Sequence, residues 1–148
     1  MSKNPLNDLG SSLGEYLREQ RTSARLSLRQ LSELAGVSNP YLSQIERGLK
    51  RPSAEILQQL AKGLEVSAES LYVKAGMFAE AAAIHEAGQD FLKAAAAHLK
   101  AGNAERAAAC FEQGGDPIKG YAALSRFSYD QGLVKEAARY AERAGDLM

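Results

Sequence analysis

Residues 26–48, LSLRQLSELAGVSNPYLSQIERG, carry the strongest structural signal in the first half of the chain. Apolar residues recur at helical spacing on both sides of Gly36. Ser27 and Gln30 form a capping-box pattern at the start of the first helix, and Ser38 can cap the second. Gly36 can end the first helix because glycine adopts a positive φ at little cost. The stretch therefore predicts two short helices joined by a tight turn.

The outward face of the second predicted helix carries side chains that suit the edge of a DNA base. Leu42 and Ile45 have the spacing of its buried side. Asn and Gln can form paired hydrogen bonds with adenine, Ser can donate or accept, and apolar side chains can contact a thymine methyl. The outward set is Asn39, Pro40, Tyr41, Ser43, Gln44 and Arg47. An ordinary solvated helix face is the alternative interpretation.

The spacing of this helix pair resembles that of a known DNA-binding family. Residues 11–75 are similar to the helix-turn-helix domain of the phage lambda repressor and Cro family, also called the XRE family. The match runs without a gap through Gly48, and LSQIERG is a strong signature of the family. The resemblance implies an all-α domain of five short helices, in which the helix at residues 38–47 lies in the major groove of double-stranded DNA.

The resemblance also implies roles for individual residues. The residues over base edges would be Asn39, Pro40, Tyr41, Ser43 and Gln44. The residues contacting phosphates would be Arg29, Ser38, Arg47, Lys50 and Arg51. Arg21 and Glu46 stand where many family members form a largely buried, structural ion pair. Leu28 stands where many phage repressors carry a phosphate-binding Gln, so the resemblance does not extend to that contact.

The composition changes at residues 75–76, where alanine becomes frequent and glycine begins to recur, mostly every 12 to 14 residues. Helices are predicted at residues 78–87, 91–101, 104–113, 117–131 and 133–144. This pattern resembles tetratricopeptide-like or other α-solenoid hairpins. The expected fold is therefore all-α, a five-helix lambda-repressor-like domain followed by a helical-hairpin array at residues 76–148. An engineered fusion is an alternative origin for this second half.

The bulky side chains near the end of the array have three interpretations. They can fill the core, form a homodimer face, or line a groove for a peptide. A stack of two hairpins leaves one flank apolar unless something covers it. The residues of the candidate dimer face are Tyr121, Leu124, Phe127, Leu133 and Tyr140.

No residue pattern in the sequence indicates an enzyme or a cofactor. There is no Ser/His/Asp or Cys/His arrangement, and the glycines lack the Lys of a phosphate-binding loop. His85 and His98 have no second ligand at a recognised metal spacing, so no metal site is expected. Cys110 lies in an alanine-rich segment and is expected to be a small core residue.

Composition and charge favour a reduced, cytoplasmic setting. The 148 residues are 45% hydrophobic and carry 18 basic and 18 acidic side chains, with one cysteine and therefore no internal disulfide. Residues 1–75 hold ten Lys and Arg against eight Asp and Glu. Residues 1–10 are polar and are expected to form a flexible arm rather than a secretory signal. No apolar run is long enough to span a membrane.

The sequence thus predicts a sequence-specific transcriptional regulator of double-stranded DNA, a dimeric repressor paired through its C-terminal helices. Such a dimer would place two reading helices about 34 Å apart on a pseudo-palindromic site. Two alternatives stay open. One is a helical-repeat scaffold in which DNA binding is secondary. The other is an antitoxin-like regulator that also binds a protein or peptide through its repeats.

Overall fold

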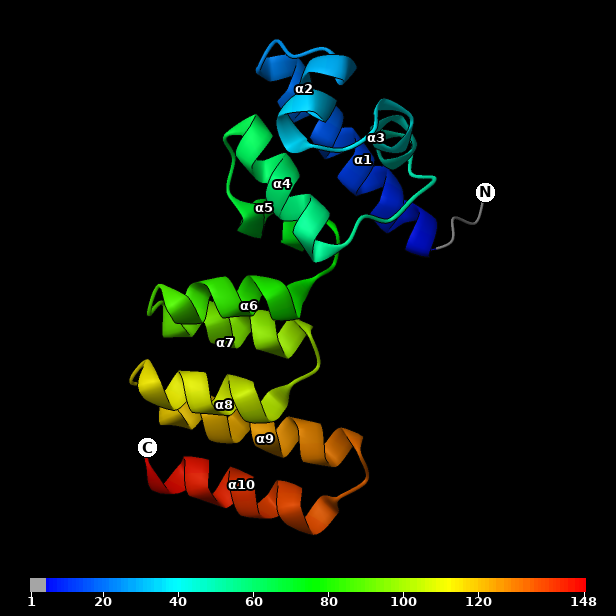
Figure 1. Ribbon diagram of the computed structural model, residues 1–148. Helices are drawn as coiled ribbons and strands as arrows, with labels where there is room; N and C mark the ends of the chain where they lie inside the picture. Colours follow the sequence, from blue (N-terminus) through cyan, green and yellow to red (C-terminus); the bar gives the residue numbers. More distant parts are fainter. Residues whose placement is uncertain (1–4) are drawn as a thin grey trace. The chain divides into compact units, whose positions relative to one another are not determined.

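The computed structural model describes the backbone of residues 5–148 and side chains from Leu13 onward. Over this range the chain forms ten α-helices and no strand, which confirms the all-α class (Figure 1). It divides into two compact units, the first ending at Met77 and the second beginning at Phe78. None of the described helices is both long and apolar enough to cross a membrane.

The first unit contains the five helices expected there. They are α1 (Pro5–Ser23), α2 (Leu28–Ala35), α3 (Asn39–Glu46), α4 (Ala54–Leu64) and α5 (Ala68–Lys74). Helix α1 packs against α3 and α5, α2 packs against α3 and α4, and α4 packs against α5. The contacts with α1 and α2 hold α3 on the side that faces the core and leave its opposite side accessible.

The predicted caps form the boundaries of α2 and α3. The Ser27 hydroxyl accepts a hydrogen bond from the Gln30 amide at 3.0 Å, and the Gln30 side chain accepts from the Ser27 amide at 2.8 Å. Gly36 ends α2 with φ 71°, a conformation that glycine adopts without strain. The Ser38 hydroxyl then accepts from the Tyr41 amide at 3.2 Å and starts α3. Local sequence therefore determines the turn between the two helices.

The core of the first unit is built from leucine and isoleucine supplied by all five helices. Burying one such side chain contributes about 1.5–3 kcal/mol relative to leaving it in water. The largest fully buried side chains are Leu17, Leu31, Leu42, Ile45, Leu57, Leu60 and Leu71.

The start of α1 differs from the expected flexible arm at residues 1–10. Helix α1 begins at Pro5, so residues 5–10 are helical, and only residues 1–4 of that arm lie outside the described range. Proline suits the first position of a helix because its missing amide hydrogen has no partner there anyway. Residues 5–10 extend the helix formed by the residues that follow them, so their helical conformation requires no separate nucleation.

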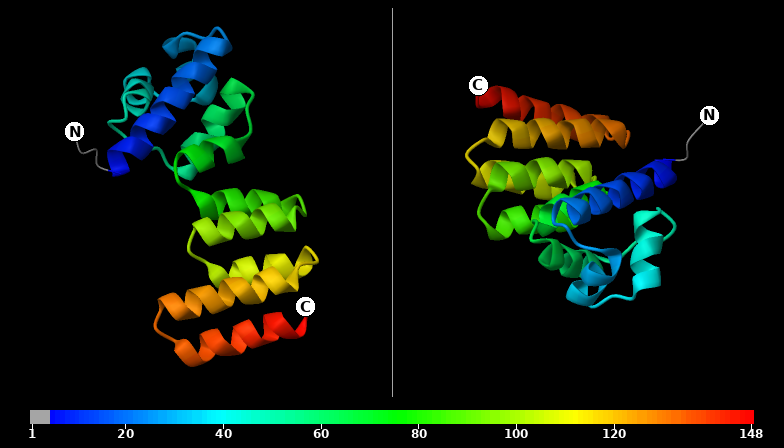
Figure 2. Two further views of the ribbon diagram at one scale, coloured as in Figure 1. Left: turned by 180° about the vertical axis from the view of Figure 1, so that it is seen from behind. Right: turned by 90° about the horizontal axis from the view of Figure 1, so that it is seen from above.

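The second unit is a series of antiparallel helices. They are α6 (Phe78–Ala87), α7 (Phe91–Lys100), α8 (Ala104–Gln113), α9 (Pro117–Asp130) and α10 (Val134–Asp146). Each packs on the next along the chain, and the helices lie side by side in the views of Figure 2. Their bounds agree with the predicted ranges to within two residues. The predicted helices are thus confirmed, whereas the tetratricopeptide-like repeat stays a prediction.

The core of the second unit consists mainly of alanine. The side chains of Ala81, Ala94 and Ala107 are completely buried, whereas the larger Leu92 and Leu99 are exposed. Small side chains allow the helix backbones to approach closely, which leaves little space between them for larger ones. Sequence periodicity alone does not reveal that the bulky residues of this half lie largely outside its core.

Candidate nucleic-acid interface

Helix α3 exposes one side and buries the other. Leu42 and Ile45 are completely or almost completely buried beneath it. Among the five residues predicted to contact bases, Asn39 and Pro40 are exposed, and Tyr41, Ser43 and Gln44 are half-buried. The five lie on a single eight-residue helix, so the structure brings them together as one short polar surface. Their accessible amide and hydroxyl groups are donors and acceptors of the kind that read base edges.

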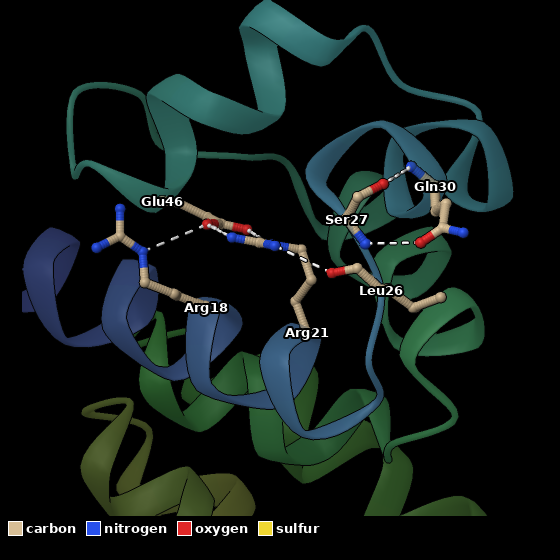
Figure 3. Close-up of polar contacts among 6 residues, drawn as sticks. All are labelled: Arg18, Arg21, Leu26, Ser27, Gln30 and Glu46. Atoms are coloured by element: carbon tan, nitrogen blue, oxygen red, sulfur yellow. Dashed lines mark hydrogen bonds and ion pairs between the residues drawn. The ribbon is translucent and has the colours of Figure 1, made fainter.

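An ion pair joins α1 to the end of α3. Arg21 donates from Nε to Glu46 Oε2 at 2.8 Å and from Nη2 to Oε1 at 3.0 Å, as Figure 3 shows. The Glu46 side chain is only 2% exposed and that of Arg21 is 17% exposed. Arg21 also donates from Nη1 to the Leu26 carbonyl at 3.0 Å. The two-pronged geometry holds α3 in register against α1 and the start of α2.

Electrostatics favour the charged form of Arg21 in this pair. The hydrogen bond to Glu46 raises the pKa of Arg21, although burial acts in the opposite direction. A second, weaker contact comes from the Nε of Arg18, which lies 3.7 Å from Glu46 Oε1 and belongs to an exposed side chain. The buried Glu46 side chain therefore faces Arg21 and Arg18, and it takes no part in the exposed surface of α3.

Gly14 provides a second constraint on the position of α3. A Cβ atom at Gly14 would lie 2.2 Å from the carbonyl oxygen of Glu46, which is far inside van der Waals contact. The backbones of α1 and α3 thus touch at this point, and only glycine fits. Sequence reasoning missed this role because a glycine inside a helix carries no local mark of the neighbour it contacts.

The predicted phosphate-contacting residues have different surroundings. Arg47 and Lys50 are exposed and follow directly after α3. The Arg29 side chain is also exposed but pairs with Glu33 at 3.3 Å. Arg51 donates from Nη2 to the Ala75 carbonyl at 3.0 Å, which ties it to its own domain. Arg47 and Lys50 thus offer exposed positive charge next to the end of α3, and Ser38 stands at its start, whereas the role of all five residues as phosphate contacts stays a prediction.

This combination of two short helices, a glycine turn and an exposed polar second helix defines a helix-turn-helix domain. Residues 17–71 match the family model HTH_3, described as Helix-turn-helix. This part of the chain is a helix-turn-helix domain of the XRE type, as the resemblance in sequence implies.

Several curated regulators are similar to the same segment. An uncharacterized HTH-type transcriptional regulator of Mycobacterium tuberculosis is 62% identical over 64 residues, which cover 43% of this chain and 46% of the relative. Transcriptional regulator ClgR of the same species is 41% identical over 64 residues, covering 43% and 57%. SinR of Bacillus subtilis is 38% identical over 60 residues, covering 40% and 54%. The chain spans about half the length of the curated relatives it matches.

One similar solved structure is the restriction-modification controller protein C.AhdI from Aeromonas hydrophila. It is 34% identical, with a TM-score of 0.42, and the match covers 43% of this chain and 96% of that one.

The predicted dimer-face residues of the second unit fall into two groups. Tyr121 and Tyr140 stack on each other within the α9–α10 pair, with ring centroids 6.5 Å apart. Leu124 is half-buried, whereas Phe127 and Leu133 are exposed. The two tyrosines and Leu124 thus pack at least partly within their own unit, whereas Phe127 and Leu133 are accessible to a partner.

An apolar groove lies between α9 and α10, in the region where a peptide groove was one of the three interpretations of the sequence. It has a volume of about 630 Å³. Its lining consists of Ala122, Ser125, Arg126, Tyr129, Val134, Ala137, Ala138, Ala141 and Ala144. Tyr129 and Val134 are both largely exposed at this groove. The alanine lining of this groove could not be predicted from the sequence, because alanine also fills the core of the same unit.

Proposed function

We propose that this protein is a sequence-specific transcriptional regulator that binds double-stranded DNA and reads the major groove with α3. The observation that carries the proposal is the polar outer side of α3, supported from behind by the Arg21–Glu46 pair and by the close contact at Gly14. The domain family of residues 17–71 and its regulator relatives support the same conclusion. No catalytic step is part of this function.

In this proposal the base contacts come from the amides of Asn39 and Gln44, from Ser43, and from the apolar surfaces of Pro40 and Tyr41. Bidentate amide contacts discriminate between bases by about 1–3 kcal/mol each. The cationic side chains that follow α3 hold the phosphate backbone and set the register of the helix, although such contacts carry no direct sequence information. The proposal places the protein in the cytoplasm, with the DNA of the cell.

We further propose that the regulator acts as a homodimer and represses transcription. The chain has equal numbers of basic and acidic side chains, so general attraction to DNA is weak and two domains on one site would strengthen binding. The proposed contact uses the two exposed residues of the candidate dimer face, Phe127 and Leu133, together with the α9–α10 groove. In a two-fold dimer the two copies of α3 would lie about 34 Å apart, or a multiple of that distance.

The α9–α10 groove also supports a second candidate function, binding of a protein or peptide partner. Its nine lining residues are mostly alanine, so an apolar helix of another protein could approach the backbone closely. In this case the second half would be an interaction scaffold, and DNA binding would be secondary.

In vitro selection from random duplex DNA with the full chain tests these proposals together. Enrichment of an inverted repeat supports both base reading and the dimer. Enrichment of a single half-site supports base reading and contradicts the dimer. If no sequence is enriched at any salt concentration, the DNA-reading function is wrong and the interaction scaffold becomes the better account.

A further inference from the structure

Three consecutive helices of the second unit bring together three potential metal-binding side chains. Glu86 on α6, His98 on α7 and Cys110 on α8 follow one another at intervals of 12 residues. Glu86 Oε1 contacts His98 Nε2, and Cys110 donates from Sγ to the same oxygen at 3.4 Å. One nitrogen, one sulfur and one oxygen ligand atom therefore lie within 4.8 Å of one another.

This cluster corrects the expectation that His98 has no second ligand. Familiar metal motifs place ligands a few residues apart on one helix or across one turn. Here each ligand comes from a different helix of the array, and only the packing of α6, α7 and α8 brings them together. Cys110 is buried as expected, but it also belongs to this polar group.

The cluster is a polar exception within an alanine core. Cys110 packs with Ala94, Ala95 and Ala107, and Phe111 completes that core. A buried imidazole at this place is less favourable than an alkyl side chain unless both ring nitrogens have partners. The Nδ1 atom of His98 is buried and has no hydrogen-bond partner. A buried polar atom without a partner calls for an explanation, and a bound ion nearby would provide one.

The cluster of Glu86, His98 and Cys110 is buried on one side and accessible on the other. His98 is 2% exposed and Cys110 is 3% exposed, whereas the Glu86 side chain is 37% exposed. Glu86 and Cys110 line a pocket of about 390 Å³ together with Phe91, Ala109, Gln113 and Arg106. Arg106 is exposed, although its positive charge still acts on Glu86 and Cys110 and favours their anionic forms. A small ion can thus reach the ligand atoms through this pocket.

We propose that Glu86, His98 and Cys110 form a binding site for a Zn²⁺ ion. Thiolate, imidazole and carboxylate are the three side-chain ligands that zinc uses in proteins. Hard cations such as Mg²⁺ and Ca²⁺ prefer sites made only of oxygen ligands, so they fit this set poorly. Three protein ligands leave the fourth tetrahedral position directed to the pocket, where water or a small anion can complete the coordination. On binding, the zinc–sulfur bond replaces the S–H bond of Cys110, and the thiol proton passes to solvent.

A redox role for Cys110 fits the same surroundings less well. Burial first, and the hydrogen bond to Glu86 second, raise the pKa of the Cys110 thiol to about 11. Reactive cysteines instead have a lowered pKa and are accessible to the oxidant. The thiol is a neutral hydrogen-bond donor when no metal is bound, and the geometry of the three ligands is the feature that distinguishes this site.

Titration of the full chain with Co²⁺, a spectroscopic substitute for zinc, tests the proposal directly. Because the protein has a single cysteine, a thiolate-to-cobalt charge-transfer band in the near-ultraviolet reports on Cys110 alone. The expected result is a band that saturates at one Co²⁺ per chain and disappears when one equivalent of Zn²⁺ is added. Absence of the band in the wild-type protein would overturn the proposal, and this measurement does not depend on the folding of any variant.

Variants then assign the ligands, with zinc affinity measured by competition against a chromogenic chelator. Cys110→Ser should abolish the cobalt band, and His98→Gln and Glu86→Gln should each weaken zinc binding by at least about tenfold. His85→Gln and Glu80→Gln are the matched controls on α6, and both should retain wild-type affinity. Far-ultraviolet circular dichroism verifies that each variant is folded. Equal zinc affinity in folded His98→Gln and wild type would contradict the site.

Discussion

Replacement of Arg21 by methionine would leave the Glu46 carboxylate almost without a partner inside the first unit. That side chain is 2% exposed, and its other contact is Arg18, 3.7 Å away and itself exposed. Removing one member of a buried ion pair typically destabilises a protein by about 3–5 kcal/mol. Arg21→Met should therefore lower the free energy of unfolding of the first unit by about that amount, a large share of the 5–15 kcal/mol typical of a whole domain.

The opposite substitution should be milder. Glu46→Gln preserves the shape of the side chain and leaves one carbonyl oxygen as an acceptor for Arg21. Arg21 also retains its hydrogen bond to the Leu26 carbonyl. We expect a loss of about 1–3 kcal/mol, the usual penalty for one poorly satisfied buried group. Arg18→Met on the same helix is the control, and it should change stability by less than about 1 kcal/mol because its ion pair is exposed.

Hydrogen–deuterium exchange of the full chain measures these effects separately in each unit. Exchange at the slowest amides of α1 to α3 reports opening of the first unit, and peptides of α8 and α9 serve as an internal reference. A loss of 3–5 kcal/mol corresponds to exchange that is roughly 150 to 5,000 times faster. An acceleration below tenfold for Arg21→Met, or a larger effect for Glu46→Gln than for Arg21→Met, would refute the argument from the buried carboxylate.

Three further substitutions test other parts of the structure. Gly14→Ala should destabilise the first unit by about 1–3 kcal/mol in urea unfolding, because the added Cβ would overlap the Glu46 carbonyl. Gly145→Ala is the control, and it should be neutral or stabilising because its Cβ would meet no atom. Equal effects of the two substitutions would contradict the close contact at Gly14. Ser38→Ala should lower stability by about 0.5–2 kcal/mol through loss of the α3 cap, and an unchanged melting midpoint would count against it. Val134→Lys should dissociate a dimer that uses the α9–α10 groove, and unchanged mass in analytical ultracentrifugation would exclude that face.

The features predicted correctly from the sequence are those that depend on neighbouring residues. The caps at Ser27 and Ser38 and the left-handed Gly36 are local, so the turn between α2 and α3 follows from residue type and spacing. Alternation of alanine runs and glycine likewise places the helices of the second unit. These signals are present in the chain before any tertiary contact forms.

The features that the sequence did not predict depend on contacts between distant elements. Gly14 matters only because α3 crosses α1 at that residue, and His98 meets Glu86 and Cys110 only after three helices pack together. Exposure of Val134 has the same origin, since alanine filled the core and left little room for larger residues. Periodicity identifies which face of a helix is apolar, but it does not identify the partner of that face.

Base reading by α3 is tested most directly by the affinity of the full chain for its selected duplex and for a scrambled duplex, in wild type and in Gln44→Ala. Gln44→Ala should lower the ratio of the two affinities by about 5- to 150-fold, equivalent to about 1–3 kcal/mol. Gln59→Ala, an exposed glutamine on α4, should leave the ratio unchanged. Equal weakening on both duplexes, or no change on either, would contradict sequence reading by this helix.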